Sequence, residues 1–278
     1  MRACPRPGSP SANLNTIAAA PYNGECLHTP DQYKLTIYEM GLCKTDPIST
    51  GVFLKEANGC VQTMLSTSGT EVDLAPGNSS EKTAALPSAS SRPANGSYPH
   101  AYILLSNGFK MKGTYELADG TTYYSKESTD EYGTFGAADK TISASAEHTD
   151  LVDNMYFGEE ENGWDGVMSA TPMPGSGTVS ALLLKECVDN TCVGASAVAA
   201  NQREVKRLLG VFSNTGSPVE ILDSTTGIEV QLIVKADPSD PANSGGGYLL
   251  IGWDQFDGNG FDIRMFGSAP FKPKFTTF

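Results

Sequence analysis

Histidine, serine and acidic side chains are the residues of this chain that could build a hydrolytic site. A serine attacks a carbonyl when a histidine takes its proton and an acid orients that histidine, often in a GxSxG turn between a strand and a helix. His100 follows Pro99 at the start of a predicted strand, and His148 lies beside Glu147 and Asp150. The sequence contains no GxSxG. We therefore interpret both histidines as structural or exposed and expect no catalytic triad.

A second candidate is an acidic run in the middle of the chain. Glycoside hydrolysis needs two carboxyl groups that face each other across a groove about 5 to 9 Å wide. Trp164, a residue type that stacks on sugars, lies among four such carboxyl groups. They are Glu159, Glu160, Glu161 and Asp165. The favoured interpretation is a solvated acidic loop with Trp164 packed beneath it, and a glycan hydrolase is the alternative.

Oxygen ligands gather near the C-terminus, where they could bind calcium. They are Asp254, Asp257, Asn259 and Asp262. Their spacing is not that of an EF-hand loop, and the final glutamate of that loop is missing. Gly258, Asn259 and Gly260 have the composition of a hairpin turn. We favour the turn and expect no metal, with calcium as the alternative.

The six cysteines fall into neighbouring pairs along the chain, which permits up to three disulfides. They are Cys4, Cys26, Cys43, Cys60, Cys187 and Cys192. Cys43 and Cys60 flank two short predicted strands, and Cys187 and Cys192 enclose a short turn, so either pair could be bridged. A structural zinc site needs closely spaced Cys and His ligands, and only His28 lies near a cysteine, so we expect none. Without a Walker A motif or a GxGxxG after a strand, nucleotide-dependent chemistry is not expected either.

Composition restricts both the fold and the partners. The chain has 278 residues, with 19 basic and 32 acidic side chains and a net charge of −13. Binding to nucleic acid requires clustered Lys and Arg, so this charge argues against it. Gly and Pro add up to 29 + 17 = 46 residues, too many for a helical bundle. No stretch is apolar enough for a membrane span or a signal peptide, so we expect a particle protein made inside a cell or a chain whose leader was removed.

The strands that must position these side chains can be predicted from the alternation of side chains between two faces and from the residues typical of turns. Residues 33–40 alternate, with Tyr33, Leu35, Ile37 and Glu39 expected on one face. Residues 51–55 and 60–65 are expected to pair as a hairpin through Asn58-Gly59. Residues 101–125 are expected to form a three-stranded meander with turns at Asn107-Gly108 and Asp119-Gly120. Further strands are predicted at 178–188, 219–222, 228–235, 248–253 and 261–266.

These patterns predict an all-β chain, an antiparallel β-sandwich of jelly-roll or immunoglobulin type, with at most one short helix. That helix is expected over 197–209, although 205–212 could equally be a strand. Residues 1–30 are expected to form an extended arm, 31–170 a β-rich domain and 267–278 an aromatic tail. Residues 171–266 are either a second β lobe or a continuation of the same sandwich, with a linker over 168–177.

One segment carries a resemblance to a known group of proteins. It reads GECLHTPDQYKLTIYEMGLCKTDP, a predicted strand bracketed by Cys26 and Cys43 with a Thr-Asp-Pro exit. The segment resembles structural proteins, of the capsid-decoration or fibre type, from phages of aquatic bacteria. It covers about a tenth of the chain. The resemblance implies a virion component and transfers no site residues.

Together these features predict a non-enzymatic structural protein. Arms and tails that find an apolar partner on another subunit build symmetric assemblies. We expect a shell, surface or fibre component of a virion or extracellular filament, with copies of itself or other particle subunits as partners. No catalytic, cofactor-binding or metal-binding residue is assigned. The alternatives are a carbohydrate-binding β-sandwich, using Trp164, Trp253 or tyrosines, and the glycan hydrolase.

Overall fold

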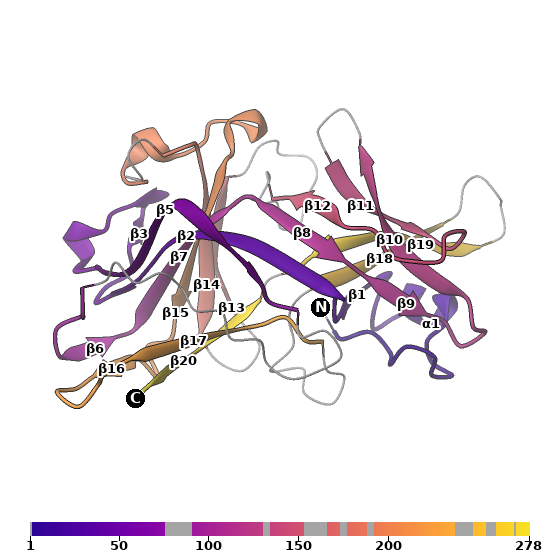
Figure 1. Ribbon diagram of the computed structural model, residues 1–278, viewed down its shortest axis with the longest axis horizontal. Helices are drawn as coiled ribbons and strands as arrows, with labels where there is room; N and C mark the ends of the chain where they lie inside the picture. The colour runs from indigo at the N-terminus through magenta and orange to yellow at the C-terminus, as the bar shows by residue number, and fades with distance from the viewer. Residues whose placement is uncertain are drawn as a thin grey trace.

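The computed structural model describes residues 2–75, 91–129, 134–152, 166–172, 177–187, 192–236, 247–253, 260–269 and 271–278. Strands dominate this part of the chain, and all strands that pair are antiparallel. The prediction of an all-β, sandwich-like fold is therefore confirmed. Figure 1 shows the strands gathered at two ends of the long axis, with β7, β14 and β15 at one end and β10, β18 and β19 at the other.

The helical elements are α1 (Leu14–Ala18), η1 (Glu56–Asn58), η3 (Ala195–Ala197) and η4 (Gln202–Glu204). The strands of the first half are β1 (Glu25–His28), β2 (Gln32–Cys43), β3 (Ile48–Ser49), β4 (Val52–Phe53), β5 (Val61–Asp73), β6 (Gly96–Tyr98), β7 (His100–Ser106), β8 (Gly108–Lys112), β9 (Thr114–Glu116), β10 (Thr122–Thr129) and β11 (Thr134–Asp139). Those of the second half are β12 (His148–Leu151), β13 (Val167–Pro172), β14 (Thr178–Leu184), β15 (Arg207–Ser213), β16 (Val219–Ile221), β17 (Ile228–Ile233), β18 (Gly247–Trp253), β19 (Phe261–Ser268) and β20 (Lys272–Thr277).

Two large sheets organise these strands. The larger, here sheet B, has the order β12-β8-β2-β7-β15-β14-β13, with β5 also paired to β2. The smaller, sheet A, has the order β1-β18-β19-β11-β10-β9. Residues 171–266 contribute β14 and β15 to sheet B and β18 and β19 to sheet A. This segment thus shares both large sheets with earlier parts of the chain, and β13 runs through the first part of the expected linker.

The predicted hairpin at Asn107-Gly108 is wrong. β7 and β8 do not pair with each other; they run in succession along β2, from the pair Cys43–His100 to the pair Gln32–Lys112. The Asn107 carbonyl accepts from the Val152 amide at 2.8 Å. On the side away from β2, β7 pairs with β15 before this point and β8 pairs with β12 after it. Asn107 thus marks a change of partner within a continuous strand.

The other two turn predictions have different outcomes. Asp119-Gly120 does connect β9 to β10, with Gly120 at φ 86°, and this turn is confirmed. Asn58-Gly59 does not close a hairpin, because β4 pairs with β3 and β5 pairs with β2. Gly59 nevertheless has the positive φ that was predicted, 59°, at the end of η1.

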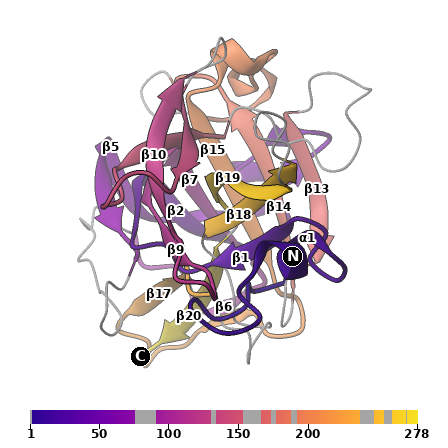
Figure 2. The ribbon, with the colours of Figure 1, turned by 90° about the vertical axis from the view of Figure 1, so that its right-hand side faces the viewer.

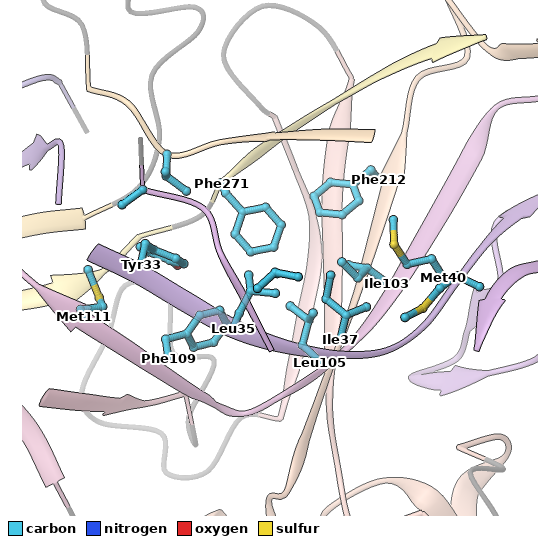
Figure 3. Close-up of a cluster of buried hydrophobic side chains, with 14 residues drawn as sticks. Tyr33, Leu35, Ile37, Met40, Ile103, Leu105, Phe109, Met111, Phe212 and Phe271 are labelled. Carbon is cyan, nitrogen blue, oxygen red and sulfur yellow. The ribbon is translucent and has the colours of Figure 1, made fainter. Parts of the chain in front are cut away.

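An irregularity in β2 decides which side chains enter the main core. Ile37 pairs with Leu105, but Glu39 pairs with Leu104, so the register shifts at Tyr38. Adjacent residues of β7 point to opposite faces, and Glu39 therefore lies on the face opposite Ile37. The expectation of one continuous face is corrected here. Figure 3 shows Leu35 and Ile37 of β2 beneath Phe212 and Phe271 in the core.

The expected extended arm is folded against sheet A. Figure 2 shows α1 and β1 beside β18 at this end of the molecule. Cys4 is bonded to Cys26, and the Cys4 amide donates to the Leu27 carbonyl at 2.6 Å. Asn13 caps α1, and Ile17 is completely buried. The arm prediction fails because buried apolar residues separated by prolines pack without any strand or helix periodicity.

The aromatic tail is also part of the chain's own fold. β20 pairs with β17, Phe271 is buried in the main core, and Phe275 packs against a smaller cluster with Tyr98 and Ile221. Only Phe278 of these aromatics is exposed. The expectation that the tail packs on a neighbour therefore does not hold for Phe271 and Phe275.

The predicted helix over 197–209 is wrong. η3 and η4 are single turns, and residues from Arg207 onward form β15, which lies between β7 and β14. Leu209 and Val211 face one cluster of buried side chains, while Phe212 faces another. A strand that is buried on both faces has a continuous apolar sequence, which periodicity cannot distinguish from a short helix. The later strands β16 to β19 occur where they were predicted.

Candidate functional site

The three histidines do not form one site. His100 begins β7 and pairs across the sheet with Ser213 of β15. His28 and His148 instead lie where sheet A meets the β12 edge of sheet B. His148 therefore belongs to a buried junction, and His100 to a partly exposed sheet end.

The His100–Ser213 pair contains a hydroxyl and a base. A distance of 2.7 Å separates Ser213 Oγ from His100 Nδ1. Burial lowers the pKa of His100, while the charge of Asp46 opposes that shift. Asp46 accepts a hydrogen bond from the Ile48 amide, and no described carboxylate hydrogen-bonds the other nitrogen of His100. The acid that would orient a catalytic histidine is thus missing from this arrangement as described.

His28 and His148 form the most unusual polar group of the described structure. Their exposed fractions are 4% and 1%. His28 Nδ1 lies 3.1 Å from the Thr29 carbonyl oxygen. His28 Nε2 and both ring nitrogens of His148 have no hydrogen-bond partner among the described residues. Buried polar atoms usually have partners, so these three nitrogens require an explanation.

Glycines make the space that the two rings occupy. A Cβ atom on Gly247, which pairs with His28, would lie 2.7 Å from His28 Nε2. A Cβ atom on Gly136 would collide with His148 Nε2 and the Phe266 carbonyl oxygen, and one on Gly113 would collide with the Phe266 ring. The rings of His28 and Phe266 meet edge to face, with centroids 5.2 Å apart. Strand glycines often mark such close approaches.

Burial is the main cause of the lowered pKa of both histidines. The pKa of His28 is lowered to about 4, chiefly by desolvation; the Thr29 carbonyl opposes this shift and the nearby His148 contributes to it. Desolvation also lowers the pKa of His148, whereas the carboxylates of Asp150, Glu127 and Glu147 act in the opposite direction. The Phe266 carbonyl also raises the pKa of His148, although it lacks hydrogen-bond geometry. Both imidazoles are therefore neutral at pH 7.

A second buried polar group lies within sheet B. Glu39, with 2% of its surface exposed, accepts hydrogen bonds from Lys55 Nζ at 2.7 Å and from the Tyr102 hydroxyl at 2.5 Å. Burial and the charge of Glu39 raise the pKa of Tyr102. Since Tyr102 is also packed edge to face on Phe53, the group connects β2, β7 and the segment after β4. This geometry stabilises the fold and leaves the carboxylate satisfied.

Of the calcium candidates, only Asp262 lies within the described residues. Its carboxylate forms an ion pair with Lys140 at 3.2 Å and accepts a hydrogen bond from Tyr123. Asp254, Asp257 and Asn259 lie outside the described residues. The described segments contain no group of three or more potential metal ligands. Lys140 and Tyr123 thus already occupy the one described carboxylate of this candidate site.

The structure does not describe the hydrolase candidates Glu159, Glu160, Glu161 and Asp165. The sugar-stacking candidate Trp164 lies outside the described residues. So does the side chain of Trp253, although its backbone belongs to β18.

The cysteines form three disulfides between sequence neighbours. They are Cys4–Cys26, Cys43–Cys60 and Cys187–Cys192. Cys43 ends β2, and its bond holds the start of β5 beside it. Disulfides persist in oxidising compartments such as the cell exterior.

One corner of the molecule exposes apolar side chains on a firmly bonded backbone. It comprises Leu222, Thr225, Thr226, Gly227 and Phe278, and is called the C-terminal corner below. Leu222 and Phe278 are 58% and 68% exposed. Thr226 and Gly227 donate backbone hydrogen bonds to the Phe278 carbonyl, and the Thr225 amide donates to the Leu222 carbonyl.

Comparison with known proteins adds no identification: no family model, curated protein or solved structure matches the chain. Within the described residues, no helix has the length and apolarity to cross a membrane. The proximity of His28 and His148 could not be predicted from local patterns, because the two residues are far apart in the chain. The one local signal was the presence of Gly113, Gly136 and Gly247 within or next to strands, because a strand glycine often marks a close approach of another group.

Proposed function

We propose that this protein is a non-enzymatic structural subunit that self-associates outside the cell, as a shell, surface or fibre component of a virion. The C-terminal corner is the observation on which the proposal rests. Its two exposed side chains belong to a turn and a strand end that are held by backbone hydrogen bonds. An apolar surface that is already ordered loses little conformational entropy when a partner covers it.

The environment of the corner favours a partner that brings apolar surface. Arg92 Nη2 donates to the Leu222 carbonyl at 2.6 Å and to Asn95 Oδ1, and Asn95 in turn donates to Asp223. The charged groups beside the corner are thus engaged within the chain. A second copy of the same corner, related by a twofold axis, would supply matching apolar side chains.

Two further observations support an extracellular structural role. Three disulfides suit an oxidising environment. Residues 24–47, which carry the resemblance to phage structural proteins, form β1 and the long strand β2. The glycan hydrolase alternative depends on the acidic residues around Trp164, which lie outside the described residues. The carbohydrate-binding alternative depends on Trp164, Trp253 or tyrosines, and neither tryptophan side chain is among the described ones.

Light scattering coupled to size-exclusion chromatography tests the proposal on the full oxidised chain. We expect concentration-dependent association that the double substitution L222S/F278S weakens about tenfold or more, because one buried Leu or Phe side chain contributes about 1.5–3 kcal/mol. Val193→Ser, beside η3, is the matched control at another exposed apolar residue. A wild-type protein that stays monomeric at its highest soluble concentration, or equal weakening by the control, contradicts the proposal.

A further inference from the structure

Sheet A and sheet B meet at a junction that contains two buried histidines. β12 lies against β10 and β11, and β8 lies against β10 and β19. The chain itself crosses between the sheets at Gly113, which separates β8 from β9. Gly113 is held there by Ser125, whose amide donates to the Gly113 carbonyl and whose hydroxyl accepts from the Gly113 amide. His28 and His148 are buried beside this crossing.

The packing of the two rings depends on their being neutral. Gly113 and Gly247 lie against His28, and Gly136 lies against His148. A proton added at His28 Nε2 or on His148 finds no hydrogen-bond acceptor with suitable geometry among the described residues. A neutral imidazole with unpaired nitrogens is tolerated at a modest free-energy cost, whereas a buried charge without a partner is far more expensive.

The charged residues on the surrounding strands do not offer that partner. Glu147 of the segment before β12 binds Lys34 at 3.0 Å. Asp150 accepts two hydrogen bonds from Ser268. Glu127 of β10 acts on His148 through its charge and forms no hydrogen bond to it among the described contacts. The remaining charged residues on the elements packed here are Glu25 on β1, Asp31 beside it, Lys110 and Lys112 on β8, Glu116 on β9, Lys126 on β10, Asp139 on β11, and Asp262 and Arg264 on β19.

We propose that His28 and His148 form an acid-sensitive latch that holds sheet A against the β12 edge of sheet B at neutral pH and releases this junction in mild acid. The latch is independent of the proposed self-association, because it lies inside one chain. Histidine is suited to this role since its charge changes between pH 5 and 8 when it is exposed to water.

The sign of the effect follows from proton linkage. An exposed imidazole titrates near pH 6.5, but His28 in the closed junction titrates near 4. The open form therefore binds more protons, and closure weakens as the pH falls from 6.5 to about 4. Between pH 7 and pH 5, His28 alone shifts the opening equilibrium about 20-fold toward the open form. His148, whose pKa is also lowered, adds to the shift in the same direction.

Carboxylates do not produce the same response in this window. Asp139, Glu147 and Glu204 have lowered pKa values through their hydrogen bonds and ion pairs, so their contribution to stability is constant above pH 5 and is lost in stronger acid. Asp31 has a pKa raised by burial and acts in the opposite sense to the latch. It is present in every variant below, and its effect therefore cancels in the comparison.

Hydrogen exchange of the full oxidised chain at pH 7, 6 and 5, corrected for intrinsic exchange rates, tests the proposal. We expect opening of β1, β11 and β12 to increase about 20-fold or more by pH 5, while β14 and β15, in the part of sheet B away from β12, keep their protection. Loss of protection at the same rate in both regions would mean global unfolding and would overturn the latch. Exchange at the junction that does not depend on pH would overturn it as well.

Non-titrating substitutions separate the latch from other acid effects. In the double variant H28Q/H148Q the increase in junction opening between pH 7 and pH 5 should disappear, however stable the junction of this variant is at pH 7. His100→Gln removes the third histidine of the chain and should leave the increase intact. If the glutamine variant does not fold, imidazole NMR of the wild type decides: a His28 that becomes protonated near pH 6.5 while the junction stays closed contradicts the proposal.

Discussion

Glu39 illustrates how a single residue's role depends on its neighbours. In the sequence it continues an alternating strand, yet the register shift at Tyr38 turns it into the face occupied by Tyr102 and away from Ile37. A carboxylate in this position is stable only because Lys55 and Tyr102 both donate to it. Removal of one partner from a buried ion pair leaves an uncompensated charge, which costs much more than the loss of a surface pair.

The first residue-scale prediction concerns that ion pair. Lys55→Met should lower the free energy of unfolding by about 3 kcal/mol, since it leaves Glu39 buried with a single hydroxyl partner. Lys110→Met breaks an exposed pair with Glu71, also at 2.7 Å, and should change stability by about 0.5 kcal/mol or less. Urea unfolding of both variants measures the difference. Equal effects would show that Glu39 is not isolated from solvent.

At the scale of elements, the continuous strand from β7 through β8 to β9 connects the whole fold. It borders β15, then β12, along one side while β2 follows the other, and it enters sheet A after Gly113. β2 is held at its far end by Cys43, whose disulfide also fixes the start of β5. This disulfide therefore joins two long neighbouring strands, whereas Cys187–Cys192 closes only a local loop.

The disulfides should accordingly differ in their contribution. Chain entropy predicts that loss of Cys43–Cys60, which has a sequence separation of 17, costs about 3 kcal/mol. Loss of Cys187–Cys192, with a separation of 5, should cost about 2 kcal/mol. Denaturant unfolding of the variants C43S/C60S and C187S/C192S, with equal m values as the control, measures both. The reverse order would contradict the entropic argument.

For the whole molecule, charge opposes the association that we propose. A subunit with a net charge of −13 repels its copies over a distance that salt controls, about 10 Å at 0.1 M. The C-terminal corner would have to overcome this repulsion with apolar contact. Its neighbours Arg92 and Asp223 are already engaged within the chain and offer little attraction to a partner.

Self-association should therefore strengthen as salt is raised. Added sodium chloride screens the repulsion between subunits and leaves burial of Leu222 and Phe278 unaffected or slightly stronger. Sedimentation velocity at neutral pH over a series of salt concentrations measures this. The variant L222S/F278S should show no comparable increase. Weaker association of the wild type in salt would instead indicate an interface of charge pairs.

Local features of the sequence were sufficient for much of the fold. The all-β class, the Asp119-Gly120 turn and the strands from β16 to β19 depend on alternation and turn chemistry, which act over a few residues. The order of the cysteines permitted up to three disulfides, and the structure gives their pairing. The tertiary structure alone decided the path of the strand through Asn107, the side of β2 that Glu39 faces, and the meeting of His28 with His148. Each of these depends on contacts between residues far apart in the chain, and no local pattern records such contacts.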